Sequence, residues 1–159
     1  MAIGDMFLKV ETAKQGTIKG EAADATHDTE ISVLSWSWGM RGHSALAGAG
    51  ATSKASLDEL RIVKKIDSAS TALMATLKNN ELVKKATLTV RKAGGQPLEY
   101  LVITLQNARI TDVGLDTQND EVVERVSFAF QKISVQYKAQ GADGLGRGAM
   151  TFDADVSPV

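Results

Sequence analysis

The chain has no cysteine in its 159 residues. This absence excludes a disulfide framework, a thiolate nucleophile and any zinc or iron–sulfur site built on cysteine. Histidine is nearly as scarce, since only His27 and His43 could serve as bases near neutral pH. Chemistry that depends on these two residue types therefore has very few places in this sequence.

No excess of charge of either sign is present. Lys and Arg total 18 against 19 Asp and Glu, and the two signs are interspersed. Nothing in this balance favours binding to nucleic acid or to an anionic membrane. No stretch approaches the 18 apolar residues of a membrane-spanning helix, and the N-terminal residues do not form a signal peptide. Length and composition predict one soluble globular domain over residues 1–159, without membrane insertion.

The sequence also lacks the motifs of common enzymes. His27 lies among carboxylates, so a general base held by an acid can be imagined, but a hydrogen-bonded structural histidine is the favoured interpretation. His43 has no second histidine at metal-ligand spacing, and no Gly-x-Ser-x-Gly or phosphate-binding loop occurs. We therefore predict no catalytic residue, no cofactor and no metal.

The strongest pattern that is present is alternation with period two, which is typical of half-buried strands. Residues 86–91 alternate apolar with polar side chains, and residues 100–105 form a second run beyond the turn residues 93–97. Further strands are expected at 5–10, 17–21, 30–38, 57–66, 108–113 and 149–153. These strands are enough to close a small antiparallel β-barrel or a sandwich, and the fold class is predicted as mostly β with one short α-helix and a long extended loop.

Residues 122–137 contain a change of phase. The apolar residues occupy even positions in the first half and odd positions in the second: Val126, Phe128, Phe130, then Ile133, Val135, Tyr137. A one-residue slip would turn one half of the strand inside out. A β-bulge near Gln131-Lys132 is therefore predicted.

A single segment, residues 69–79, has helical spacing of its apolar residues. Ser68 or Ser70 could cap it, and the apolar side chains are Ala69, Leu73, Met74 and Leu77. We expect this helix to cover an open barrel end rather than to line a cofactor groove.

Both tryptophans lie in one predicted strand. Trp36 and Trp38 share one face, and Ser35 and Ser37 share the other. The predicted core includes Trp36, Trp38, Phe128 and Phe130. The two serines would then face outward, toward water or into a shared lumen.

The stretch from about residue 39 to residue 56 consists of small residues that cannot build a core. It is either a mobile linker or an arm that becomes ordered on a neighbouring subunit, and the sequence favours neither. As a candidate inter-subunit loop its first residues are Gly39, Met40, Arg41, Gly42, His43, Ser44, Ala45, Leu46, Ala47 and Gly48.

Two blocks give the chain a family resemblance. Trp36-Ser37-Trp38-Gly39 and Arg91-Lys92-Ala93-Gly94-Gly95, with Gly141-Ala142-Asp143-Gly144 near the end, resemble the haemolysin-coregulated protein (Hcp) family. The resemblance implies a homohexameric ring whose stacks form the inner tube of a type VI secretion machine and carry effectors through the lumen. Its implied partners are further copies of itself, the spike protein, the sheath and the effectors. It implies assembly in the cytoplasm followed by secretion, with the loop after Trp38 reaching a neighbour.

Two alternatives remain open from the residues. One is a secreted effector, although the few residues after Tyr137 are too short for an added toxin domain. The other is a monomeric β-barrel that binds a small ligand, with the helix gating its cavity.

Overall fold

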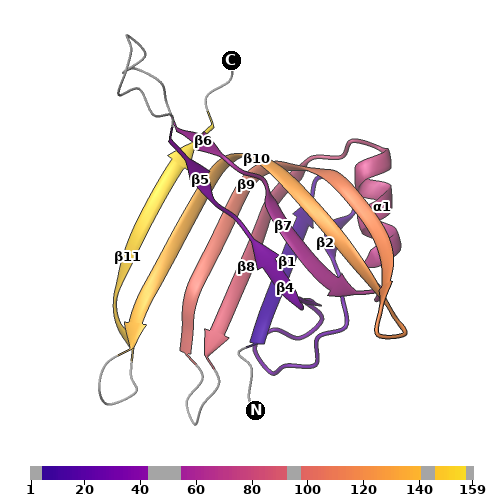
Figure 1. Ribbon diagram of the computed structural model, residues 1–159, viewed down its shortest axis with the longest axis horizontal. Helices are drawn as coiled ribbons and strands as arrows, with labels where there is room; N and C mark the ends of the chain where they lie inside the picture. The colour runs from indigo at the N-terminus through magenta and orange to yellow at the C-terminus, as the bar shows by residue number, and fades with distance from the viewer. Residues whose placement is uncertain (1–4, 43–54, 93–97, 141–145, 157–159) are drawn as a thin grey trace.

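The computed structural model describes residues 5–42, 55–92, 98–140 and 146–156. These residues form a mostly antiparallel β-structure with one α-helix at one side (Figure 1). The elements are β1 (Asp5–Thr12), β2 (Gly16–Ile18), β3 (Ile31–Ser32), β4 (Ser35–Ser37), β5 (Met40–Arg41), β6 (Ser56–Leu57), β7 (Leu60–Lys65), α1 (Ser70–Lys78), β8 (Val83–Lys92), β9 (Leu98–Gln118), β10 (Glu121–Gln140) and β11 (Gly146–Asp155). The predicted hairpin of residues 86–91 and 100–105 is the pairing of β8 with β9.

One large sheet carries nearly all of these strands. Its order is β2-β1-β8-β9-β10-β7-β4, with β3 on β1 and β11 on β10, while β5 and β6 pair separately. The strand β10 has two partners along one edge, because residues 123–128 pair with β7 and residues 132–140 pair with β11. The sheet therefore continues past β7 as a three-strand extension.

Among the described residues, the strand pairing does not form the closed barrel that was expected. The ladder has β2 at one end and β4 at the other. A single bent segment links the two ends, since Val33 N donates to Met6 O of β1 at 3.0 Å and Leu34 N donates to Val63 O of β7 at 2.7 Å. The chain changes partner between these adjacent residues, so no continuous ladder closes the ring there.

The sheet bends along one row that crosses three strands. In each strand two consecutive residues at this row are exposed: Lys84-Lys85 in β8, Gln106-Asn107 in β9 and Gln131-Lys132 in β10. In β9 and β10 the buried apolar residues next to the row occupy odd positions on the side of the row that belongs to the extension and even positions on the other side. The extra residue in each strand keeps apolar side chains on the core side along the whole length.

The predicted phase change is therefore at Gln131-Lys132, but the predicted shift of pairing is elsewhere. Gln131 faces Asn107, the extra residue of β9, so the register of β9 with β10 is the same on both sides of the row. The register shifts instead between Ser127 and Phe128. Because both strands contain an extra residue at this row, their register does not change there. The sequence of one strand alone could not show this.

Asn107 has a backbone φ of +51°, in the left-handed region. We expect Asn107→Ala to lower the free energy of unfolding by about 1–2 kcal/mol, because a Cβ without a local polar group is disfavoured there. Asn107→Gly is the matched control and should change it little. Urea denaturation measures both, and equal losses in the two variants would contradict this account.

The helix α1 is fixed to the sheet by a buried ion pair. Lys64 and Glu124 are paired residues of β7 and β10, and both side chains are fully buried. Lys64 Nζ lies 2.6 Å from Glu124 Oε1, 2.7 Å from Asp67 Oδ1 and 3.0 Å from Ser70 Oγ. The start of α1 is thereby held against the sheet.

The helix begins without the predicted serine cap. Its N-cap position is Ala69, which makes no side-chain cap hydrogen bond. Asp67 Oδ1 accepts from Ala69 N at 2.9 Å, and Ser70 Oγ accepts from Asp67 N at 3.0 Å. In the described residues, no helix is long and apolar enough to cross a membrane.

Removing one member of the buried pair should be costly. Lys64→Met leaves Glu124 buried without a counter-charge, and we expect a loss of about 3–5 kcal/mol in unfolding free energy. The double variant Lys64→Met with Glu124→Leu should recover most of that loss. Chemical denaturation of the two variants tests this, and a double variant as unstable as the single one would refute it.

Candidate functional site

The candidate site is the extension of the sheet beyond β7, made of residues 98–105 of β9, 132–138 of β10 and 149–155 of β11. In Figure 1 it lies at the opposite side of the molecule from α1. Residues directly opposite one another in adjacent strands share one face of a sheet. The register therefore assigns each side chain of the extension to one of two faces.

One face of the extension is apolar and continues from the core. Its three rows, each running from β1 to β11, are Val10, Ala86, Leu105, Ile133, Ala154; then Leu8, Leu88, Ile103, Val135, Phe152; then Met6, Val90, Leu101, Tyr137, Met150. We call these residues the apolar face.

The opposite face is mainly polar. Its rows from β8 to β11 are Thr87, Thr104, Ser134, Asp153 and Thr89, Val102, Gln136, Thr151. We call these residues the polar face. The extension is thus amphipathic. The core of the same chain covers only part of its apolar side.

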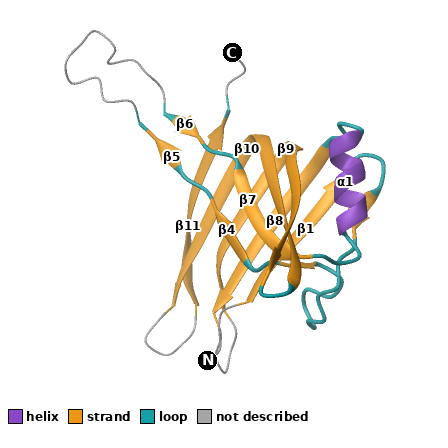
Figure 2. Ribbon diagram, turned by 45° about the vertical axis from the view of Figure 1, so that its right-hand side comes forward, coloured by secondary structure: helices purple, strands orange, loops and turns teal. Residues whose placement is uncertain are grey.

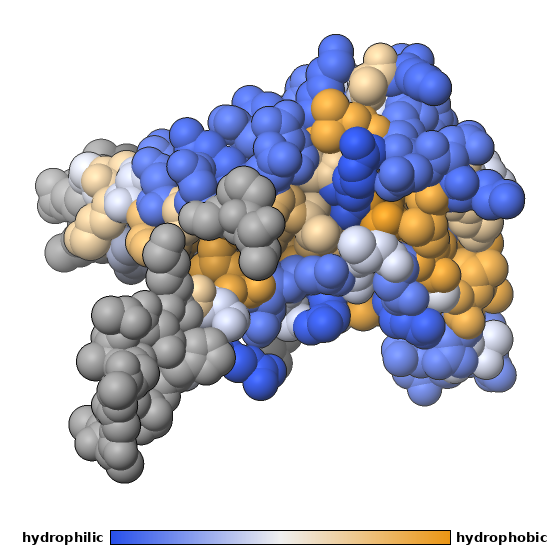
Figure 3. All heavy atoms as spheres, turned by 90° about the horizontal axis from the view of Figure 1, so that it is seen from above, coloured by the Kyte–Doolittle hydropathy of each residue, from blue (hydrophilic) through white to orange (hydrophobic). Residues whose placement is uncertain are grey.

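Exposure rises steadily along the apolar face. Leu88 is fully buried and Ile103 is 1% exposed, but Phe152 is 42% and Met150 is 64% exposed. On the side of the molecule seen in Figure 3, apolar surface lies between hydrophilic regions. A contiguous exposed apolar face with polar surroundings is typical of an interaction surface.

The strand β11 is also an edge. Among the described strands it pairs only with β10. An edge strand of ten residues offers backbone donors and acceptors to a further strand, which soluble proteins usually avoid unless the edge is covered. Edge and apolar face together favour a second polypeptide at this end of the sheet.

The described residues at the two ends of the predicted inter-subunit loop form a narrow stalk of two short strands, β5 and β6 (Figure 2). Met40 pairs with Leu57 and Arg41 with Ser56, and Asp58 N donates to Gly39 O at 3.0 Å. Gly39, Met40, Arg41 and Gly42 are thus placed, and Met40 is exposed. His43, Ser44, Ala45, Leu46, Ala47 and Gly48 lie outside the described residues.

The other named residues lie on or beside the core. Phe128 is fully buried and Phe130 nearly so. Trp36 and Trp38 are half-buried and pack against the core cluster, and Trp38 Nε1 donates to Asp58 O at 2.9 Å. Ser35 and Ser37 are exposed. Tyr137, Met150 and Phe152 were not predicted as site residues, although the alternation in residues 149–153 was visible.

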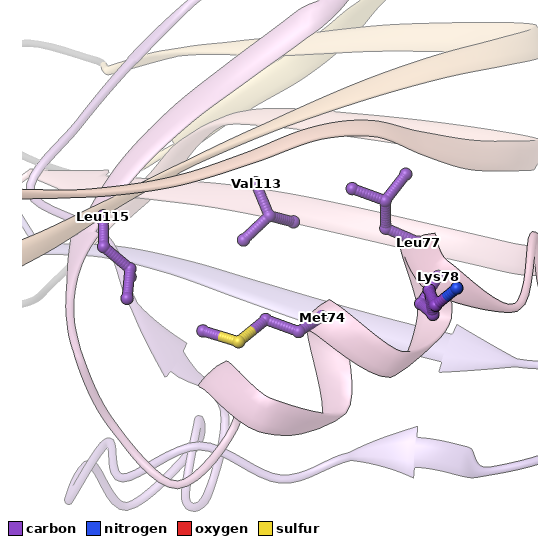
Figure 4. Close-up of a pocket in the computed structure, with 5 residues that line it drawn as sticks. All are labelled: Met74, Leu77, Lys78, Val113 and Leu115. Carbon is purple, nitrogen blue, oxygen red and sulfur yellow. The ribbon is translucent and has the colours of Figure 1, made fainter.

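Apart from the apolar face, an apolar hollow lies between α1 and β9 (Figure 4). Its volume is about 340 Å³, and it is lined by Met74, Leu77, Lys78, Val113 and Leu115. A specific ligand site needs a few convergent polar groups. The only charged side chain here is Lys78, so this hollow provides little to orient a small ligand.

His27 is buried and both of its ring nitrogens face carboxylates. Nδ1 lies 3.0 Å from Glu30 Oε2, and Nε2 lies 2.5 Å from Glu99 Oε1. Burial opposes protonation, but the hydrogen bonds to Glu30 and Glu99 outweigh it and raise the pKa of His27 above its usual value. Within the described ranges no cluster of His, Asp and Glu could hold a metal ion.

Comparison with known proteins agrees with this fold. A family model described as "Type VI secretion system effector, Hcp" matches residues 7–137. Protein hcp1 of Pseudomonas aeruginosa is 38% identical over 149 residues, which cover 91% of this chain and 89% of that protein.

Solved structures show the same relationship. A type VI secretion system effector from Yersinia pestis is 30% identical, with a TM-score of 0.76, covering 96% of this chain and all of that one. Hcp1 from Salmonella typhimurium is also 30% identical with a TM-score of 0.76, covering 97% and 95% of the two chains. These relatives define the class as components of the type VI secretion system, structural and secreted rather than enzymatic.

The chain belongs to the Hcp family of that system.

The exposed β11 end of the apolar face should matter little to the stability of one isolated chain. We expect Phe152→Ala to change the unfolding free energy by about 1 kcal/mol or less, since its side chain is already partly in water. Phe128→Ala, the matched change in the core, should cost about 3–5 kcal/mol. Urea denaturation at concentrations where native mass reports single chains is the measurement; comparable losses would show that Phe152 is part of the core.

Proposed function

We propose that this chain is a structural subunit of the type VI inner tube, which forms six-membered rings that stack and carry effectors through their lumen. The observation that supports this most is the apolar face, which one chain leaves partly uncovered. Burial of apolar surface is the main favourable contribution to association between proteins. A second copy of the chain is the partner that the family relationship makes most natural.

Ring closure needs an interface between two different surfaces of the subunit. A patch that binds a different patch on the next copy generates a ring when the rotation closes. The extension supplies one patch at the end of the sheet away from α1. Leu34 and Ile66, which are exposed around a hollow at the start of β4 and the end of β7, are the candidates for the other.

The polar face then suits the lumen. On β9, β10 and β11 its threonine, serine and glutamine side chains can be hydrated, and Val102 is its one apolar residue. Ser35 and Ser37, exposed on β4, remain candidates for the lumen or for the outer surface. Barrel closure, which one chain lacks along its ladder, would be completed between neighbours.

The stalk of β5 and β6 has a separate role in this proposal. Residues 39–56, of which β5 and the start of β6 are described, would act as an arm that contacts the next ring. The spike protein, the sheath and the effectors are the further partners, and the chain would assemble in the cytoplasm and leave the cell with the tube. No catalytic residue is assigned.

A charge on the apolar face should prevent ring formation. Phe152→Asp would bury a carboxylate without a partner in the interface, and we expect the six-chain species to be lost. Thr151→Asp is the matched control, because it places the same charge one residue away on the polar face. Native mass spectrometry should give multiples of the 16.9 kDa chain: six for the wild type and Thr151→Asp, and one for Phe152→Asp.

Circular dichroism shows whether each variant is folded, so a loss of rings through unfolding can be told from a loss of the interface. Intact rings in Phe152→Asp would remove the apolar face from the interface. A wild-type chain that stays monomeric at high concentration would overturn the ring proposal altogether.

A further inference from the structure

Residues 19–30 form a covering segment between β2 and β3, over the outer side of β1 and β8. The segment doubles back on itself, because Gly20 N donates to Thr29 O at 2.7 Å and Ala22 N donates to Glu30 O at 2.9 Å. A Cβ at Gly20 would stand 2.7 Å from Glu30 O, so only glycine allows this close approach. The tip of the segment, residues 25–29, carries His27.

His27 joins this tip to two other strands. Its ring stacks on Phe7 of β1, with ring centroids 4.5 Å apart and planes 9° from parallel. Its Nε2 faces Glu99 near the start of β9, 72 residues away along the chain. The other ring nitrogen faces Glu30 within the covering segment.

These contacts require a particular protonation state. An ionised carboxylate can only accept hydrogen bonds, and a neutral imidazole has only one N–H to donate. A neutral His27 would therefore place a lone pair against one carboxylate oxygen. The imidazolium has two N–H groups and satisfies both Glu30 and Glu99, with a charge that offsets theirs.

Other charged groups lie near His27, in the covering segment and on the neighbouring strands. Arg91 of β8 lies over the Phe7 ring, with its Cζ 5.1 Å from the ring centroid, and donates hydrogen bonds to Asp24 and Asp5 at 2.6 Å each. The hydrogen bond from Arg91 keeps the pKa of Asp24 far below its usual value. Lys138 of β10 lines the same hollow as Arg91 and Glu99.

We propose that His27 is a pH-dependent latch: as an imidazolium it ties the tip of the covering segment to Glu99 of β9, and on losing its charge it releases that tie. The anchor from Asp24 to Arg91 persists, so the tip loosens while the rest of the segment stays in place. The latch does not depend on ring formation, and its test can fail while the proposed function stands.

The direction of the effect follows from the raised pKa of His27. The stabilising contribution is fully present below the unfolded-state pKa of about 6.5 and is lost as pH rises through the higher folded-state value. Each pKa unit between the unfolded-state and folded-state values means that the charged form of His27 is held about tenfold more strongly than the neutral form.

The histidine titration can be measured directly, because the chain has only two histidines. Side-chain ¹⁵N chemical shifts followed against pH give one midpoint for each, and the spectrum of His27→Gln identifies which belongs to His27. We expect a midpoint above 6.5 for His27 in the wild type and a lower midpoint in Glu99→Gln, where one carboxylate is replaced by a neutral amide. A wild-type midpoint at or below 6.5, or no change in Glu99→Gln, would overturn the latch.

Hydrogen exchange tests the release of the tip itself. After correction for intrinsic exchange, the amides of residues 25–29 should lose protection in the wild type as pH passes the His27 midpoint, while the core strands stay protected. His27→Gln should show low protection at the tip across the same range. Protection that is independent of pH in the wild type would refute the proposal even if His27→Gln failed to fold.

Discussion

The pairing of β9 with β10 is the constraint on which the rest of the structure depends. The two strands have 21 and 20 residues, far more than the usual five or six. Both must remain paired with each other along their length, so neither can end where the core ends. One half of the pair packs against β7 and α1, and the other half continues as the extension with β11.

The extra residues at Gln106-Asn107 and Gln131-Lys132 allow this long pair of strands to keep one side buried along its whole length. Without an extra residue in each strand, the alternation that buries Phe128 would have turned Ile133 outward. The strand β1 has no extra residue opposite Lys84, and its register with β8 shifts there, between Glu11 and Thr12. A local departure from regular pairing thus keeps the same side of the sheet apolar from β1 to β11.

Much of this could be predicted from the sequence, because alternation records which side of a strand is buried. Most strands of the large sheet, the single helix and the change of phase at Gln131-Lys132 follow from it. The bounds do not: β9 was predicted as two strands, 100–105 and 108–113, and the predicted strands 30–38 and 57–66 are each divided in two. The burial of Lys64 was not predicted, although Lys64 occupies the phase of Leu60 and Ile62. Strand order and register could not be predicted, because they depend on contacts between residues far apart in the chain. The matching extra residue at Asn107 was therefore missed, and the register shift was placed wrongly.

The candidate site escaped sequence reasoning for the same reason. Phe152 lies between Thr151 and Asp153, and Phe128 lies between Ser127 and Ala129, so nothing local shows that one of them lies at the end of the sheet. Only the strand order puts Phe152 in the row of Leu88 and Ile103, beyond the part that the core covers. The chain also separates the groups that stabilise it from the groups that it leaves exposed: Lys64 and Glu124 fix the helix, and His27 fixes the covering segment, away from the apolar rows of β11. A partner bound to that end of the sheet would therefore bury side chains that the isolated chain does not require for folding.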